Sequence, residues 1–109
     1  DRVLHPALPD CPGHKIWQRD FTGSSGLFSV VFKKCSPAGM AALVDGLELF
    51  ALGGSWGGFE SLVLPTNATR TVTEWHDNGR CVRFHAGLED PDDLIEDLAA
   101  GVKRLTAAG

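Results

Sequence analysis

A glycine-rich stretch near the middle of the chain is the first place where the residue types suggest chemistry. Residues 53–61 read Gly-Gly-Ser-Trp-Gly-Gly-Phe-Glu-Ser, so that glycines surround Ser55 and Trp56. Because glycine has no Cβ, the backbone around it can approach a ligand closely. One interpretation is that Ser55 and the N–H groups near Trp56 face a ligand, with the indole packed against it. The alternative is a turn followed by a core tryptophan, since glycine-rich turns are common.

Arg83 is the second candidate, a lone cation between Val82 and Phe84 in a segment with the alternating pattern of a half-buried strand. The guanidinium fork matches the two oxygens of a carboxylate, and such charge-assisted pairs strengthen where water is partly excluded. Arg83 therefore indicates a carboxylate-binding site. An exposed arginine, or an internal ion pair to Glu60 or Glu89, would explain the same residue without a ligand.

The other groups of reactive side chains favour structural explanations. A structural zinc site takes four N or S ligands set close together, whereas the chain offers two separate Cys/His pairs, so we expect no metal. Acidic residues at a helix start are stabilised by the positive end of the helix dipole. The serines show no triad arrangement, which gives no support to a hydrolase. The two Cys/His pairs are Cys11 with His14 and Cys81 with His85. The acidic residues are Asp90, Asp92 and Asp93, and the serines are Ser24, Ser25 and Ser61.

Runs of apolar and β-branched residues predict the strands that would position these candidates. The predicted strands are residues 27–32, 61–64 and 81–86, with residues 71–75 as either an edge strand or a loop. In the third of these strands the period of two places Arg83 and His85 on the face opposite the apolar side chains.

Two amphipathic helices are predicted, each begun by a capping residue and a proline, at Ser36-Pro37 and at Asp90-Pro91. The first should run for about 15 residues to the glycines at 53–54, which suit a helix end. The inward faces would be Met40, Leu43, Val44, Leu47 and Phe50 in the first helix, and Leu94, Ile95, Leu98, Val102 and Leu105 in the second. Residues 3–26 are rich in Pro and Gly and should contain only a short helical turn at 15–19.

These elements favour an α+β fold, with a mostly antiparallel small sheet and helices packed on one face. The chain has 109 residues, of which 43% are apolar and 22% charged, as expected for one globular core. A net charge of -4 without a basic run argues against a nucleic-acid partner. No apolar stretch approaches the roughly 20 residues that cross a bilayer, so no membrane partner is expected. The three scattered cysteines favour reduced thiols and a cytoplasmic location.

Three segments together resemble, in order and spacing, the last third of the transsulfuration enzymes, the pyridoxal-phosphate (PLP) dependent family of the cystathionine lyases. The segments are Gly-Ser-Ser-Gly-Leu-Phe-Ser at 23–29, Gly-Ser-Trp-Gly-Gly-Phe-Glu-Ser at 54–61 and Val-Arg-Phe-His-Ala-Gly-Leu-Glu-Asp-Pro-Asp-Asp-Leu at 82–94. The resemblance spans nearly the whole chain. Trp56 favours the β-lyase branch, because the synthases and γ-lyases of this family usually carry leucine there.

The resemblance implies the C-terminal small domain of a fold-type-I PLP enzyme, which closes over a site built mainly by a preceding large domain. Residues 1–22 would lead out of that missing large domain, and residues 23–109 would form the small domain. Arg83 would bind the α-carboxylate of cystathionine, Ser55 would lie beside the cofactor lysine and the substrate, and Trp56 would contribute to carboxylate contacts and substrate selection. The full-length enzyme would be a homo-oligomer that converts cystathionine to homocysteine, pyruvate and ammonia.

The chain departs from the family pattern at the cofactor lysine. That lysine lies in a Ser-x-Thr-Lys context, which none of the lysines at positions 15, 33, 34 and 103 shares. We therefore expect no catalytic lysine here, and neither bound PLP nor activity for these residues alone. Other activities of the family remain as alternatives, namely cystathionine γ-synthase, γ-lyase or cysteine desulfhydrase. A non-catalytic module that binds amino acids is a further alternative, because fold alone does not give function.

Overall fold

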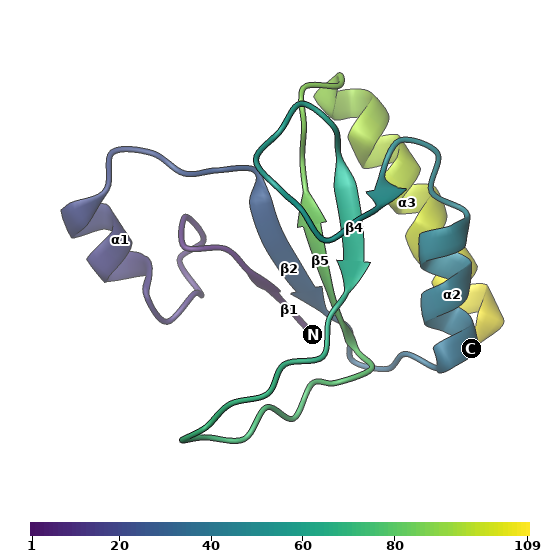
Figure 1. The fold of residues 1–109 in the computed structure, drawn as a ribbon, viewed down its shortest axis with the longest axis horizontal. Coiled ribbons are helices and arrows are strands. Elements are labelled where there is room, and N and C mark those ends of the chain that lie inside the picture. The colour runs from purple at the N-terminus through teal and green to yellow at the C-terminus, as the bar shows by residue number, and fades with distance from the viewer.

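A five-stranded sheet with two helices on one face forms the centre of the molecule in a computed structural model that describes residues 1–109 (Figure 1). The elements in chain order are β1 (Arg2–Leu4), α1 (His14–Asp20), β2 (Leu27–Val31), α2 (Pro37–Asp45), β3 (Ala51–Leu52), β4 (Leu62–Pro65), β5 (Cys81–His85) and α3 (Pro91–Ala108). The strand order is β1-β2-β5-β4-β3. Neighbouring strands are antiparallel except β3, which runs parallel to β4. The predicted fold class is confirmed.

The central strand β5 places Arg83 in the middle of the sheet, opposite Ser29 of β2 and Leu64 of β4. Successive side chains of a strand point to opposite faces. Phe84 belongs to the core cluster beneath the helices, so that Arg83 and His85 lie on the face without helices. The separation of the two faces by the period of two is confirmed.

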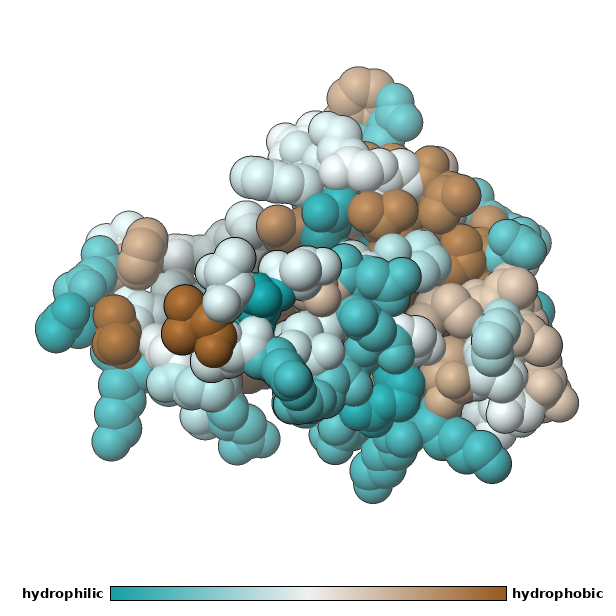
Figure 2. Space-filling view, turned by 60° about the horizontal axis from the view of Figure 1, so that its bottom comes forward, coloured by the Kyte–Doolittle hydropathy of each residue, from teal (hydrophilic) through white to brown (hydrophobic).

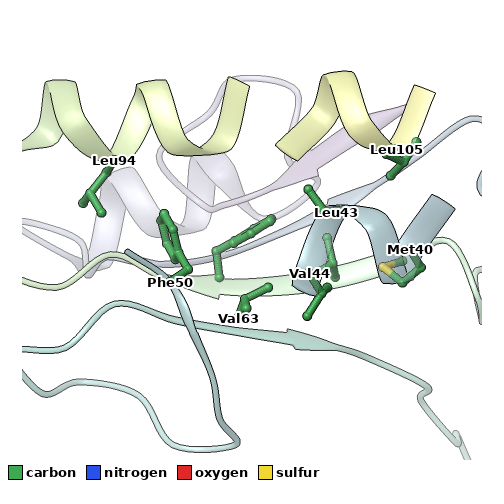
Figure 3. Packing of buried hydrophobic residues seen from close by; sticks show 9 residues of the cluster. Met40, Leu43, Val44, Phe50, Val63, Leu94 and Leu105 are labelled. Atoms are coloured by element: carbon green, nitrogen blue, oxygen red, sulfur yellow. The ribbon is translucent and has the colours of Figure 1, made fainter. Parts of the chain in front are cut away.

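The core lies between α2, α3 and the helix-covered face of the sheet (Figure 3). The Phe84 ring stacks on Phe28 with centroids 5.3 Å apart and meets the edge of Phe50 at 5.4 Å. Burial of each large apolar side chain contributes about 1.5–3 kcal/mol to the stability of the fold. The core therefore stabilises the sheet that carries the residues on its other face. The cluster consists of Met40, Leu43, Val44, Phe50, Val63, Val82, Phe84, Leu94 and Leu105.

The buried stripe of α3 differs from the prediction. Leu94 and Leu105 are buried, but Ile95 and Val102 are 64% and 43% exposed, and their assignment to the inward face was wrong. Gly101 lies in the contact instead, where an added Cβ would come within 2.7 Å of a Leu43 methyl group. The two helices therefore approach each other through a glycine, which a search for periodic apolar residues does not register.

Helix α2 ends earlier than predicted, at Asp45 rather than near residue 50. Ser36 caps its first turn as predicted. After the helix, the Asp97 carboxylate of α3 accepts hydrogen bonds from the N–H groups of residues 48–49, at 2.9 and 2.8 Å. These bonds hold the chain in a non-helical path that leads into β3. Phe50 lies in this non-helical segment and its side chain is buried. Its helical spacing therefore indicated burial and not a helix.

The N-terminal segment contains a strand where none was predicted. β1 pairs with β2 at the edge of the sheet, and Arg2 of β1 donates to the Asp77 carboxylate at 2.5 Å. Arg80 binds the other oxygen of the same carboxylate at 2.5 Å. This ion-pair cluster ties β1 to the turn before β5. The boundary between a leading segment and a domain at residues 22 and 23 stays a prediction.

Helix α1 lies to one side of the sheet (Figure 1) and contains no buried residue. It confirms the helical turn predicted at residues 15–19. The long connection between β4 and β5, residues 66–80, contains no strand, which settles residues 71–75 as loop.

Hydrophobic side chains reach the surface at the side of the molecule that holds α1. Ile16 of α1 and Val72 of the β4–β5 connection are 57% and 94% exposed. Figure 2 shows hydrophobic groups among hydrophilic ones at its left end. No helix has both the length and the apolar character needed to cross a membrane.

All three cysteines, Cys11, Cys35 and Cys81, are free thiols. Burial raises the pKa of the Cys35 thiol above its ordinary value, because it disfavours the charged thiolate.

Candidate functional site

The glycine-rich residues 53–61 form a loop, here called the 53–61 loop, that joins the parallel strands β3 and β4. A two-residue hairpin cannot join parallel strands, because the chain must return to the end at which the first strand began. Two hydrogen bonds of 3.1 Å close the base of the loop, from the N–H of Ala51 to the carbonyl of Ser61 and from the N–H of Gly53 to the carbonyl of Val63. Gly57 has φ +89°, a left-handed conformation that glycine adopts without strain.

Ser55 and Trp56 lie together on the wall of a hollow of about 220 Å³. Phe59 and Glu60 belong to the same wall. The Trp56 side chain is 58% exposed and that of Phe59 is 68% exposed. The interpretation of Trp56 as a core residue is therefore excluded. The loop presents two aromatic rings and a hydroxyl group to solvent, which are groups that can pack against and orient a small polar ligand.

The half-buried Arg83 reaches this loop from the sheet. Its Nη2 donates a 2.8 Å hydrogen bond to the carbonyl oxygen of Gly54, the residue before Ser55. Arg83 takes part in none of the ion pairs of the chain, so that the alternatives of a pair to Glu60 or Glu89 are excluded. A guanidinium has five N–H donors, and the remaining ones are free for a carboxylate.

His85 also contacts the loop, although the sequence suggested it only as a possible metal ligand with Cys81 and not as a substrate-binding residue. It lies two residues after Arg83 on the same face of β5 and is only 6% exposed. Its Nε2 lies 3.0 Å from the carbonyl oxygen of Gly58 and 3.3 Å from the backbone nitrogen of Gly57. Its Nδ1 is buried without a partner. The period of two placed His85 beside Arg83, which was the one available signal.

The segment after β5 anchors the far end of the loop. The N–H of Gly87 donates to Ser61 Oγ at 2.8 Å, and the N–H of Leu88 donates to the carbonyl of Phe59 at 2.9 Å. A Cβ on Gly87 would overlap the Phe59 carbonyl oxygen, so that only glycine allows this close approach. Ser61 is 1% exposed, and its hydroxyl serves as a structural acceptor.

The side chains of this chain do not by themselves fit PLP. The family holds this cofactor through a lysine, and the lysines at 15, 33, 34 and 103 are all exposed and none lines the hollow beside Trp56. His14, which the sequence offered as a possible metal ligand, contacts the carbonyl oxygen of Pro6 through Nδ1 at 2.8 Å. No three His, Cys, Asp or Glu side chains gather into a metal-binding group. The candidate site therefore consists of a cation, a hydroxyl group and two aromatic rings.

Comparison with curated proteins gives relatives of similar sequence and much greater length. The cystathionine beta-lyase MetC of Escherichia coli (strain K12) is 50% identical over 110 residues, which cover 95% of this chain and 28% of that protein. The L-alanine/L-glutamate racemase of Wolbachia pipientis wMel is 42% identical over 108 residues, covering 95% of this chain and 27% of that protein. The chain thus spans 28% and 27% of the length of these relatives.

A solved structure has the same fold over the whole chain. The cystathionine gamma synthase from Xanthomonas oryzae pv. oryzae in complex with cystathionine has a TM-score of 0.85 and 29% sequence identity, and the match covers 100% of this chain and 30% of that one. The model of a family described as Cys/Met metabolism PLP-dependent enzyme matches residues 1–103. The chain therefore belongs to the family of PLP-dependent enzymes of Cys/Met metabolism.

Proposed function

We propose that this chain is the substrate-binding C-terminal domain of a PLP-dependent carbon–sulfur β-lyase, and that Arg83 binds the α-carboxylate of cystathionine in the full-length protein. The observation that carries the proposal is the state of Arg83. Its guanidinium has no carboxylate partner and spends one donor on the carbonyl of Gly54, the residue before Ser55, while its other donors have no partner. A half-buried arginine without an anion is suited to receive one from a ligand.

The side chains around Arg83 have distinct tasks in this proposal. Two parallel N–H···O bonds from Arg83 fix the plane of the carboxylate and so the direction of the substrate Cα–H bond, and such orientation contributes several kcal/mol to catalysis. Ser55 offers a hydroxyl next to the substrate. The exposed indole of Trp56 packs against the substrate and selects among side chains, in a hollow that also contains Phe59.

The cofactor belongs to the full-length protein. When bound, PLP supplies the electron sink that allows the Cα–H and Cβ–S bonds to break. We propose that its lysine and its phosphate site lie in a large domain outside these 109 residues, since each relative described above is more than three times as long. The products would then be homocysteine, pyruvate and ammonia. A homo-oligomer and a cytoplasmic location complete the proposal, the latter supported by three free thiols.

Other reactions of the family share the need for carboxylate binding. One relative, 42% identical, is an L-alanine/L-glutamate racemase, and the solved relative described above is a cystathionine gamma synthase. Arg83 would serve these reactions equally. The β-lyase reaction is preferred because 50% identity to a cystathionine beta-lyase accompanies a tryptophan at position 56.

Product analysis of the full-length protein tests the reaction. With PLP and cystathionine we expect pyruvate, ammonia and homocysteine in equal amounts. Cysteine with 2-oxobutyrate would identify a γ-lyase instead, and loss of optical rotation from L-alanine would identify a racemase. Either result in place of pyruvate would overturn the β-lyase proposal while leaving the carboxylate role of Arg83 open to its own test.

Calorimetry on the isolated residues 1–109 tests the remaining alternative, a non-catalytic module that binds amino acids. We expect no binding of cystathionine and no retention of PLP after dialysis, because the chain lacks a lysine at the site. Binding of cystathionine without cofactor would favour the module.

A further inference from the structure

Two side chains of β5 hold the exposed part of the 53–61 loop at two separate points. Arg83 binds the carbonyl of Gly54 at 2.8 Å, and the ring of His85 lies against the backbone of Gly57 and Gly58 at 3.3 and 3.0 Å. Ser55 and Trp56 are the two residues between these points. Because Arg83 and His85 alternate with Phe84 on one strand, both reach the loop from the same face of the sheet.

The loop has little else to hold it between these points. No backbone-to-backbone hydrogen bond involves residues 54–58, all of which are exposed. Its glycines widen the range of backbone conformations that compete with the one observed. The side chains of Arg83 and His85 therefore supply the hydrogen bonds that select one path for Ser55 and Trp56.

The protonation pattern of the His85 ring follows from its surroundings. A proton on Nε2 allows the ring to donate to the carbonyl of Gly58 and leaves Nδ1 as an unpaired acceptor. A proton on Nδ1 would let Nε2 accept from the N–H of Gly57 at 3.3 Å instead, but it would give up the shorter bond to Gly58 and leave a buried donor without a partner, which is the rarer and costlier situation. The ring at 6% exposure is thus best described as a buried donor to Gly58.

We infer that His85 is a positioning residue, which holds the Ser55–Trp56 segment over β5 in the conformation that receives the substrate. It touches the loop backbone and acts on the ligand only through that loop. The statement about substrate rests on the proposed function, whereas the statement about the loop does not. This role is additional to that of Arg83, because His85 acts at the other end of the segment.

Chymotrypsin cleavage of residues 1–109 measures the conformation of the loop directly, since Trp56 and Phe59 are exposed in this chain and are sites for this protease. Cleavage of a folded protein follows the population of locally opened chain. A hydrogen bond contributes about 0.5–1.5 kcal/mol net, so that His85→Leu should speed cleavage after residues 56 and 59 about two- to tenfold. His85→Gln, whose amide can still donate toward Gly58, should stay near the wild-type rate. His76→Leu, which alters an exposed histidine in another loop, should leave the rate unchanged.

Steady-state kinetics of the full-length protein with cystathionine then measures how the conformation of the loop affects substrate binding. We expect a KM about two- to tenfold higher in His85→Leu, with recovery in His85→Gln and a smaller change in kcat. Wild-type cleavage of the loop in His85→Leu would overturn the inference, and so would equal acceleration in the Leu and Gln variants, because ring packing would then hold the loop. Should His85→Leu be cut throughout the chain, His85→Asn replaces it, since its polar amide is too short to reach Gly58. An absence of lyase activity would reject the proposed function and leave the cleavage result decisive for the loop.

Discussion

The Nη2 of Arg83 donates to the carbonyl oxygen of Gly54 at 2.8 Å, which joins the only unpaired cation of the central strand to the residue that precedes Ser55. One side chain thus serves both the proposed carboxylate and the loop beside it. A substitution at position 83 should therefore affect substrate binding more than the loss of a single surface charge would.

Arg83→Lys in the full-length protein should lower kcat/KM for cystathionine by roughly 12- to 150-fold. Lysine keeps the charge but loses the planar fork of donors, and a hydrogen bond to a charged group contributes about 1.5–3 kcal/mol. Steady-state kinetics measures the change. Arg19→Lys, at an exposed arginine paired with its neighbour Asp20, is the matched control and should behave as wild type. Equal kinetics for Arg83→Lys and the control would contradict a bidentate carboxylate contact.

Trp56→Leu should change the choice of reaction more than the stability of the protein. The indole is 58% exposed, and substitutions at such positions usually alter the free energy of unfolding by no more than about 0.5 kcal/mol. If the indole selects the substrate, the ratio of pyruvate to 2-oxobutyrate formed from cystathionine should fall. Phe59→Leu removes an exposed ring from the same hollow and is the control. A ratio that moves equally in both variants would indicate a general effect of aromatic surface instead of selection by Trp56.

The sequence allowed the main strands and the face of Arg83 to be predicted, because these depend on local alternation of apolar and polar residues. It did not allow β1 and β3 to be predicted. β3 has two residues, both exposed, and exists through its pairing with β4. β1 exists through its pairing with β2, and an ion pair joins its Arg2 to Asp77, 75 residues away. Neither strand has a pattern of its own.

The candidate site was predictable to a similar degree. Unusual local composition made candidates of Ser55, Trp56 and Arg83. In the structure, the hydrogen bond from Arg83 to the carbonyl of Gly54 connects the strand to the loop that holds the other two. His85 did not stand out, because its partners Gly57 and Gly58 are 28 and 27 residues away and contribute only backbone atoms. Contacts from a side chain to a distant backbone leave no trace in residue types.

Gly87→Ala should destabilise the protein by about 1–3 kcal/mol, the usual cost of forcing an extra group into a packed site. The added Cβ would overlap the carbonyl oxygen of Phe59, a backbone atom that cannot turn aside as a side chain can. Urea unfolding measures the loss. Gly58→Ala is the control, since an added Cβ there meets nothing within 4 Å. A midpoint for Gly87→Ala equal to that of Gly58→Ala would show that the 87–89 segment is free to move away from the loop.

Asp77→Asn should destabilise the protein near pH 7 and cease to do so in acid. The hydrogen bond from Arg2 is the main cause that lowers the pKa of Asp77, and the charges of Arg2, Arg80 and His76 add to it against the opposing effect of burial. A carboxylate whose native pKa lies below its unfolded value of about 3.9 adds stability above that value. This contribution disappears as the pH falls through the native pKa.

Urea midpoints of the wild type and of Asp77→Asn, measured from about pH 7 to about pH 3, should therefore converge below about pH 4. Asp45→Asn, at an exposed carboxylate without an ion pair, should match the wild type throughout. A gap for Asp77→Asn that stays constant down to about pH 3 would contradict the role of the charge. The loss of stability would then come from the shape or the hydrogen bonds of the amide. Only an effect that depends on the ionised carboxylate can vanish when the wild-type residue takes up a proton.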